Sequence, residues 1–360
     1  MPLRTKIDTG CLPRYLGTSE EDTALIDLAT NENRLGPSAL ALRAYAEASA
    51  DLFRYPDSTH AQLKAALFER YGVPGDGIAC GAGSDELISL LTRLFAGPGD
   101  EVLFPDFSFI MFLRYALRVG ATPVRARTIG YRLSVDAILE SLTGKTSIVF
   151  VANPNNPTGS YLPKSEIRRL AANIPANIPL VLDSAYSEYA GDSDYSDGLD
   201  LMDEFKNVIV LRTFSKLYGL AGLRIGWCAA PTSLVDKLNR LRGPYNITGP
   251  AQAAASMALA DRGHEDASRE HNKLWRTRLT QEISQSGFQV EPSGGNFITV
   301  IFPNPAAAQG AHRHIAGMGM LTRPLHDYGM PECIRITVGR TEDNERIIEA
   351  FRGLAQMRNA

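Results

Sequence analysis

The stretch that decides the fold of this chain is RTFSKLYGLAGLRIGW, from Arg212 to Trp227. It places a single lysine, Lys216, between hydroxyl side chains and a glycine-rich turn, with Arg224 eight positions further along. Burial lowers the pKa of a lysine, and the neutral amine can then condense with an aldehyde. Taken alone, the same residues would also fit an exposed lysine beside a surface turn. The rest of the chain decides between the two interpretations.

The neighbours of Lys216 favour a phosphorylated ligand. Thr213 and Ser215 offer hydroxyl groups, and Arg224 offers a planar set of donors. These groups together suit a phosphate dianion. Pyridoxal phosphate carries both an aldehyde and a phosphate, so we predict that this stretch binds pyridoxal phosphate, with Lys216 bonded to the aldehyde.

Composition limits the classes of function. The chain has 360 residues, of which 44% are apolar and 21% charged, and a protein of this length is expected to form two domains. The net charge of −3 gives no overall basic field for nucleic acid or an acidic membrane. Small-molecule substrates are therefore the expected partners, and nucleic acid and membranes are not.

Metal binding and export are not expected either. The four cysteines are far apart and form no C-x-x-C pair, and the six histidines have no carboxylates at metal-ligand spacing. The first residues contain no continuous apolar segment of the kind found in signal peptides and membrane anchors. We expect a cytoplasmic protein without a metal.

Apolar runs alternate with helical patterns along the middle of the chain, which predicts an α/β fold with a parallel sheet. The expected strands are 101–104, 147–152, 180–183 and 208–212. The expected helices are 85–95, 164–172 and 233–242. We expect a large, doubly wound, mostly parallel domain over residues 30–245 and a smaller α/β domain over 246–360, which an N-terminal arm, 1–29, joins.

Two motifs follow expected strands in the first half of that domain. In GAGSDEL, Gly83, Ser84 and Asp85 lead into a helix whose first backbone amides can hold a phosphate, although a simple helix cap explains them as well. Phe107 follows the next strand and can stack on an aromatic ring, although most such residues belong to the core.

Two further motifs suit the ring of the cofactor. In NPNNPTG, residues 153–159, Asn156 can donate to a phenolate oxygen from a proline-restricted turn. Asp183 ends an expected strand and can pair with a protonated pyridine nitrogen. Tyr186 can reach the same oxygen as Asn156, and Ala185 is small enough for the ring to lie flat on it.

These motifs, in this order, resemble those of the fold type I pyridoxal-phosphate aminotransferases over essentially the whole chain. The resemblance implies that Lys216 carries the cofactor and acts as general base and acid. It also implies that Asp183 contacts the pyridine nitrogen, whereas Asn156 and Tyr186 contact the ring oxygen. The implied phosphate and ring contacts are Ser84, Asp85, Thr213, Ser215, Arg224 and Phe107.

A narrower resemblance is to the histidinol-phosphate aminotransferases, through NENRLGPS at 31–38, RYPD at 54–57 and IRITVGR at 334–340. It implies a homodimer in which Tyr55 reaches the cofactor phosphate of the neighbouring subunit. It also implies substrate contacts from Tyr15, Asn33, Arg323 and Arg335.

The role of the two arginines stays open at this point. Arg335 can serve the phosphate of the substrate or the carboxylate of the amino-acid co-substrate, and Arg323 and Arg335 together suit a phosphate monoester.

The expected reaction converts histidinol phosphate and 2-oxoglutarate into imidazole acetol phosphate and glutamate, in histidine biosynthesis, by a ping-pong mechanism. The alternatives on the same scaffold are an aromatic amino-acid aminotransferase and a threonine-phosphate decarboxylase. A ligand sensor without turnover would be expected to lack the lysine or to carry a DNA-binding module. Because Lys216 is present and no such module is seen, we favour an enzyme.

Overall fold

The computed structural model describes residues 25–359, with the exception of residue 192. Its larger sheet has seven strands in the order β2-β8-β7-β6-β5-β3-β4. Their bounds are β2 (Ile78–Gly81), β3 (Glu101–Pro105), β4 (Thr122–Ala126), β5 (Thr146–Ala152), β6 (Leu180–Asp183), β7 (Val208–Thr213) and β8 (Gly226–Ala229). Only β8 runs against the other six, because it pairs antiparallel with both β7 and β2. The predicted α/β fold with a mostly parallel sheet is confirmed.

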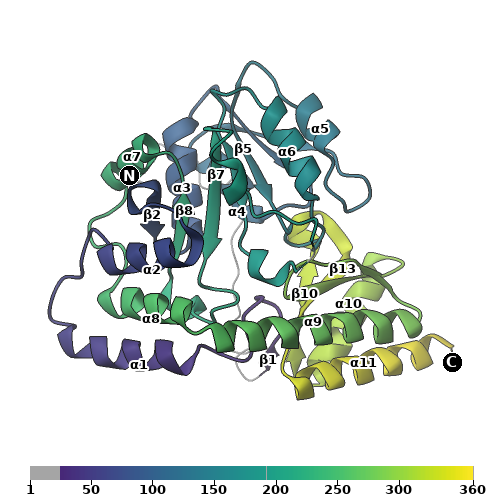
Figure 1. Cartoon of the computed structure of the whole chain (residues 1–360). Coiled ribbons are helices and arrows are strands. Elements are labelled where there is room, and N and C mark those ends of the chain that lie inside the picture. The colour runs from purple at the N-terminus through teal and green to yellow at the C-terminus, as the bar shows by residue number, and fades with distance from the viewer. Residues whose placement is uncertain (1–24, 192, 360) are drawn as a thin grey trace, which may run out of the picture.

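Helices cover both faces of this sheet (Figure 1). One face packs against α3 (Ser84–Phe95), α4 (Ile110–Arg118) and α7 (Thr232–Leu241). The other packs against α1 (Ala39–Ala48), α2 (Ala61–Tyr71), α5 (Val135–Glu140), α6 (Lys164–Asn173) and α8 (Gly249–Ala260).

The strands are continuous apolar runs because each is buried from both sides. In β7, Val208 and Val210 enter one core, whereas Ile209 and Leu211 enter the other, as the alternation of side chains along a strand requires. The four strands and three helices expected from the sequence are confirmed to within one residue at each end.

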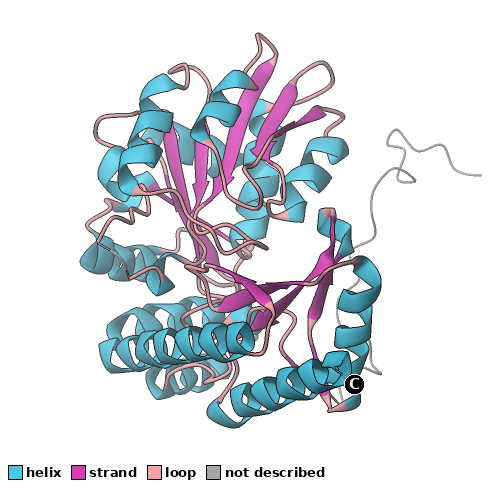
Figure 2. Cartoon of the chain, turned by 90° about the vertical axis from the view of Figure 1, so that its right-hand side faces the viewer, coloured by secondary structure: helices cyan, strands magenta, loops and turns pink. Residues whose placement is uncertain are grey.

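A second, smaller unit is built on an antiparallel sheet in the order β12-β13-β10-β9 (Figure 2). Its strands are β9 (Gln289–Glu291), β10 (Phe297–Ile301), β12 (Arg323–Leu325) and β13 (Met330–Thr337). Its helices are α9 (Arg262–Gln285), α10 (Pro305–Gly317) and α11 (Thr341–Asn359). From the N-terminal side, β1 (Ile26–Asp27) pairs with β11 (Met320–Leu321), and Leu28 enters the same core.

The division between the two units differs from the sequence-based one. A boundary at residue 246 places α8 in the smaller domain, whereas the structure packs α8 against α1 and α2. Ala251, Ala254 and Ala255 of α8 are fully buried in the core of the large sheet. Their short side chains let the three helices approach closely, so the chain passes to the smaller unit only at Asp261, between α8 and α9.

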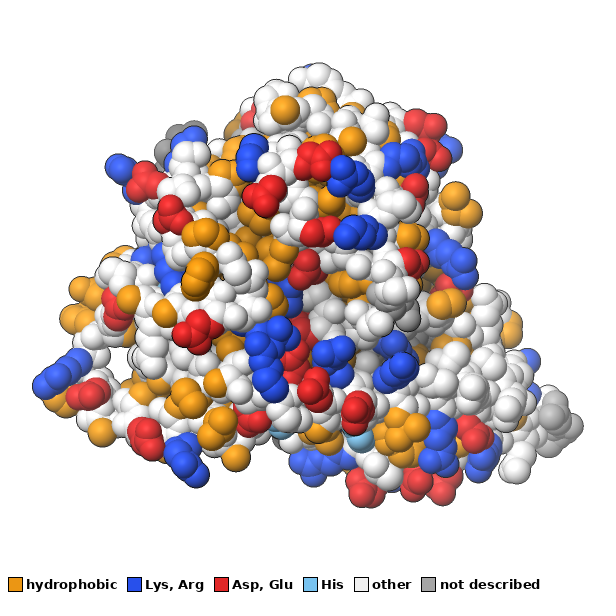
Figure 3. All heavy atoms as spheres, in the orientation of Figure 1, with side chains coloured by type: hydrophobic (Ala, Val, Ile, Leu, Met, Phe, Trp, Pro, Cys, Tyr) orange, Lys and Arg blue, Asp and Glu red, His pale blue; other side chains and the backbone are white. Residues whose placement is uncertain are grey.

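The surface carries charges of both signs. In Figure 3, basic and acidic side chains are interspersed over the visible face, without a large patch of one sign. No helix among the described residues is long and apolar enough to cross a membrane. Cys80, Cys228 and Cys333 are buried thiols, and Cys11 lies outside the described residues.

Candidate active site

The predicted motifs meet at the carboxyl ends of the parallel strands. Asp183 ends β6 and Thr213 ends β7, and these strands are neighbours in the sheet. The turn after β2 leads directly into α3 at Ser84, beside the end of β8. In open α/β sheets this edge is where ligands bind.

Lys216 lies at this edge with a partly buried side chain. Its Nζ donates a hydrogen bond of 3.0 Å to the carbonyl oxygen of Thr30 and lies 5.7 Å from the centre of the Tyr186 ring. Burial, and next the positive charge of Arg335, lower the pKa of Lys216 to about 7. A large share of the amine is therefore neutral near pH 7 and able to attack an aldehyde.

Asp183 is a buried carboxyl with an exposed fraction of 5%. Burial raises its pKa to about 7, against the opposing effect of a 3.3 Å hydrogen bond from the Ala185 backbone N–H. Within the described part of the chain, Asp183 forms no salt bridge. A buried carboxylate needs a cationic partner, and a protonated pyridine nitrogen would supply one.

Two donors are placed for the ring oxygen of such a ligand. The Asn156 Oδ1 accepts a hydrogen bond from Arg335 Nη1, so the amide nitrogen of Asn156 is the group left to donate outwards. The Tyr186 hydroxyl accepts from Asn31 Nδ2 at 2.9 Å. Burial raises the pKa of Tyr186 to about 12, so this hydroxyl keeps its proton and can donate it.

The phosphate candidates form one cluster at the start of α3. The Arg224 guanidinium lies against Gly83, where an added Cβ would come within 2.5 Å of Arg224 Nη2. Arg224 Nη1 donates to Ser215 Oγ at 3.4 Å, and the Ser215 N–H donates to Thr213 Oγ1 at 3.1 Å. Ser84 begins the helix, so hydroxyls, backbone amides and a guanidinium converge as a dianion requires.

Three predicted residues have other partners in the structure. The Asp85 carboxylate accepts from the Tyr115 hydroxyl at 2.7 Å. The Asn33 amide donates to the Leu217 carbonyl at 2.7 Å and so anchors the turn beside Lys216. The Phe107 ring packs edge-on against Tyr131, with 5.3 Å between centres. Their predicted ligand contacts, and the packing of a ring on Ala185, stay predictions, and Tyr15 lies outside the described residues.

Arg323 and Arg335 are directly opposite each other on β12 and β13. Cross-strand partners project from the same face of a sheet, so both guanidinium groups lie on one side. Arg335 is buried and also donates to the Ala29 carbonyl, whereas Arg323 is partly exposed and pairs with Asp327 at 3.4 Å. Because Arg335 contacts Asn156, this pair of cations borders the proposed ring site.

Tyr55 is 82% exposed in the single chain and stacks on Tyr245, with 4.6 Å between ring centres. Leu52 and Phe53 beside it are 69% and 78% exposed. Such a run of large apolar side chains at a surface is typical of a protein interface.

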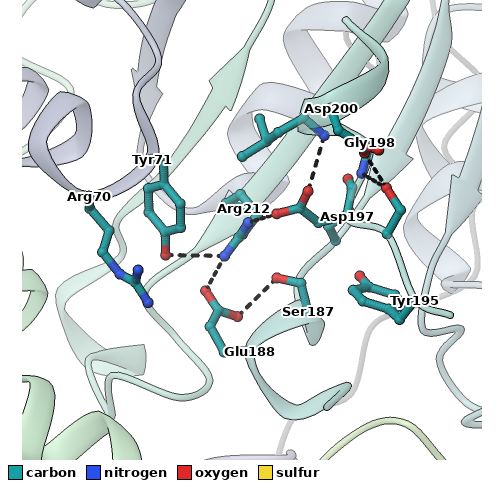
Figure 4. A network of polar contacts seen from close by, with 12 residues as sticks. Arg70, Tyr71, Ser187, Glu188, Tyr195, Asp197, Gly198, Asp200 and Arg212 are labelled. Atoms are coloured by element: carbon teal, nitrogen blue, oxygen red, sulfur yellow. Dashed lines mark hydrogen bonds and ion pairs between the residues drawn. The ribbon is translucent and has the colours of Figure 1, made fainter. Parts of the chain in front are cut away.

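A buried ion-pair network supports the strand end that leads to Lys216 (Figure 4). Arg212 Nη2 donates to Glu188 Oε1 at 2.8 Å and to the Tyr71 hydroxyl at 3.1 Å, and Arg212 also pairs with Asp197. Tyr71 is in turn hydrogen-bonded to Tyr218, two residues after Lys216. The network holds together α2, β7 and the loop after Tyr186, and sequence reasoning did not identify it.

Sequence reasoning also missed the segment Ala29–Asn31, whose three residues contact Arg335, Lys216 and Tyr186 in turn. The signals in the sequence are the polar run TNEN directly after an apolar one and the motif NENRLGPS, which begins at Asn31 but was given no role for that residue.

The donor set fits pyridoxal phosphate. It offers an amine for the aldehyde, a buried carboxyl for the ring nitrogen, two donors for the ring oxygen and a cluster for the phosphate. Among the described residues, no group of histidine, cysteine, aspartate and glutamate side chains is placed to hold a metal ion.

Comparison with known proteins decides the family. The family model described as aminotransferase class I and II matches residues 23–351. The chain belongs to this family. The aminotransferase activity and the pyridoxal phosphate cofactor expected from the sequence are thereby confirmed.

The aminotransferase is similar to proteins named histidinol-phosphate aminotransferase. One from Paramagnetospirillum magneticum is 42% identical over 330 residues, which cover 91% of each chain. One from Roseobacter denitrificans is 43% identical over 333 residues, which cover 92% of each. The crystal structure of the Sinorhizobium meliloti protein, in complex with pyridoxal-5'-phosphate, has a TM-score of 0.87 and 27% identity, and covers 92% of this chain and 91% of that one.

The phosphate cluster makes a testable prediction. A Gly83→Ala substitution puts a Cβ where Arg224 lies and also strains a backbone with φ of +80°. Because a charge-assisted hydrogen bond contributes about 1.5–3 kcal/mol, we expect the Kd of pyridoxal phosphate to rise about tenfold or more. Titration of the cofactor-free aminotransferase, followed by fluorescence, measures it.

Gly99→Ala is the matched control, since Gly99 has φ of +96° and open space around its Cβ position. It imposes backbone strain without displacing Arg224. A Gly83→Ala protein that binds the cofactor as tightly as the Gly99→Ala protein would contradict this assignment.

Proposed function

We propose that this aminotransferase transfers the amino group of histidinol phosphate to 2-oxoglutarate, giving imidazole acetol phosphate and glutamate. The observation that carries the proposal is the cross-strand pair of Arg323 and Arg335 beside Asn156. Two guanidinium groups on one side of a sheet suit the dianion of a phosphate monoester, whereas an aromatic side chain such as that of phenylalanine offers them no anionic group. The relatives named for the same substrate support it.

Each residue of the proposed site has a separate role in the reaction. Pyridoxal phosphate, when bound, supplies a protonated ring that withdraws electrons from the substrate carbon. Asp183 holds the proton on the ring nitrogen, and Asn156 and Tyr186 hold the ring oxygen. Lys216 Nζ, a large share of which is neutral near pH 7, would take the proton from the substrate carbon as general base and give it back as general acid. The Thr30 carbonyl holds this amine whenever it is free.

Both half-reactions use the same site, and this determines the order in which the substrates bind. The carbonyl product leaves before 2-oxoglutarate enters, and the same groups then act in reverse, so the kinetics are ping-pong. In the second half-reaction Arg335, the more buried of the two arginines, takes a carboxylate of the oxo acid.

The substrate assignment is tested by half-reactions. Holoenzyme is mixed separately with histidinol phosphate, phenylalanine and phosphothreonine, and the visible absorbance of the cofactor is followed. We expect kcat/KM for histidinol phosphate to exceed that for phenylalanine by far. An equal or reversed preference would make this an aromatic amino-acid aminotransferase, and release of carbon dioxide from phosphothreonine would make it a decarboxylase.

Arg323→Gln tests the phosphate contact itself. We expect kcat/KM for histidinol phosphate to fall about tenfold or more, since a charge-assisted hydrogen bond is lost. Histidinol, which has the same amine and imidazole but no phosphate, is the matched control, and its kcat/KM should change by less than about twofold. Equal losses with both amines would show that Arg323 does not contact the phosphate.

We further propose that the aminotransferase is a homodimer in which Tyr55 completes the site of the neighbouring subunit. The exposed Leu52, Phe53 and Tyr55 support an interface at this surface, because water contact with such side chains is unfavourable. Among the described residues, no tyrosine hydroxyl forms a hydrogen bond with Ser215 or Arg224, so a second subunit can supply one.

Hybrid dimers test this assembly. Lys216→Ala and Tyr55→Ala proteins are each expected to be nearly inactive, but a mixed dimer of the two contains one site with Lys216 and the partner's intact tyrosine. We expect mixing, after subunit exchange, to restore activity well above either parent. If Tyr55 acted within its own subunit, no site in the mixture would be complete and activity would not return.

A further inference from the structure

The segment Ala29–Thr30–Asn31 lies between the two units and contacts three groups of the active site in succession. The Ala29 carbonyl accepts from Arg335 Nη2, and the Thr30 carbonyl accepts from Lys216 Nζ at 3.0 Å. Asn31 Nδ2 donates to the Tyr186 hydroxyl at 2.9 Å. Asn31 is the only one of the three that acts through its side chain.

Asn31 is held rigidly by the smaller unit. Its backbone N–H donates to Thr337 Oγ1 at 3.0 Å, and the Thr337 hydroxyl donates back to Asn31 Oδ1 at 3.2 Å. Its carbonyl accepts from Asn296 Nδ2 at 3.1 Å. Asn31 has an exposed fraction of 1% and a left-handed backbone with φ of +57°. Because Oδ1 is bonded to Thr337, Nδ2 is the atom turned towards Tyr186.

The hydrogen bond from Asn31 restricts the direction in which the Tyr186 hydroxyl can point its proton. The phenolic oxygen accepts from Asn31, so its own proton cannot lie on that hydrogen bond and is directed elsewhere. The Tyr186 ring is also fixed, because it packs edge-on against Phe297 with 5.3 Å between centres. A hydroxyl that accepts one hydrogen bond becomes a stronger donor in the next.

We propose that Asn31 is a positioning residue that makes the Tyr186 hydroxyl a donor to the cofactor ring oxygen and so sets the pH at which the bound cofactor loses its proton. A donor to an anionic ring oxygen stabilises the deprotonated cofactor and lowers that pH. Asn31 touches neither the cofactor nor the substrate in this role. This role can be tested without an amine substrate, so it does not depend on which substrate the aminotransferase uses.

The test is a pH titration of the holoenzyme, followed by the visible absorbance of the bound cofactor. Tyr186→Phe should raise the midpoint by about one pH unit, as expected when one donor to an anion is lost. Asn31→Gly removes the amide without backbone strain, since glycine accepts a positive φ. It should raise the midpoint by about half a unit, because the remaining tyrosine donates more weakly.

The double variant separates this role from a structural one. With Tyr186→Phe already present, Asn31→Gly should leave the midpoint unchanged, because the pathway through the hydroxyl is gone. An equal rise in both backgrounds would overturn the proposal, and so would an unchanged midpoint in the Asn31→Gly single variant.

Asn296→Ala is the matched control for a loosened segment. It removes a hydrogen bond to the Asn31 carbonyl but leaves the Asn31 amide and Tyr186 in place. We expect its midpoint to match that of the unmodified aminotransferase, even where its melting temperature falls. A rise as large as that of Asn31→Gly would assign the effect to the position of the segment and overturn a specific role for the amide.

Discussion

The burial of the Lys216 amine and the Asp183 carboxyl at one edge of the sheet is the constraint on which the rest of the structure depends. Burial is the largest of the effects that move the pKa of both groups to about 7, downwards for the amine and upwards for the carboxyl. A buried ionisable side chain is energetically unfavourable unless it has a bonding partner, which a ligand can supply. Pyridoxal phosphate supplies a partner for each group, because its aldehyde suits the Lys216 amine and its ring nitrogen suits the Asp183 carboxyl.

The surrounding contacts hold these two groups in place without neutralising them. Arg212 and Glu188 fix the end of β7 beneath the turn that carries Lys216. From the other side, the segment of residues 29–31, which lies between the two units, contributes two carbonyls and one side-chain amide. The site is therefore made where the two units meet, and a change in their relative position would alter several of its contacts together.

Local sequence predicted the parts of the site that depend on local structure. Asp183 was predicted because it ends an apolar run, and the ends of parallel strands share one edge. Thr213 was predicted because its hydroxyl lies close to Lys216 in sequence. The cluster of Gly83, Ser84 and Arg224 was found because glycines and a helix start are visible in sequence.

Contacts between distant segments could not be predicted in this way. The bond from Asn31 to Tyr186 joins residues 155 positions apart. The ion pair of Arg212 with Glu188 depends on how two loops pack, and the placement of α8 depends on how closely its alanines fit against α1 and α2. Single-sequence patterns carry no information on such packing. The bond from Asn33 to the Leu217 carbonyl is a further contact of this kind, and the substrate contact predicted for Asn33 stays a prediction.

The most direct test of the account is to find where the cofactor is attached. Holoenzyme is reduced with borohydride, which makes the bond between lysine and cofactor permanent, and is then digested and analysed by mass spectrometry. We predict one pyridoxyl group for each chain, on the peptide that contains Lys216, and none in a Lys216→Ala protein. A pyridoxyl group on another lysine, or none at all, would contradict it.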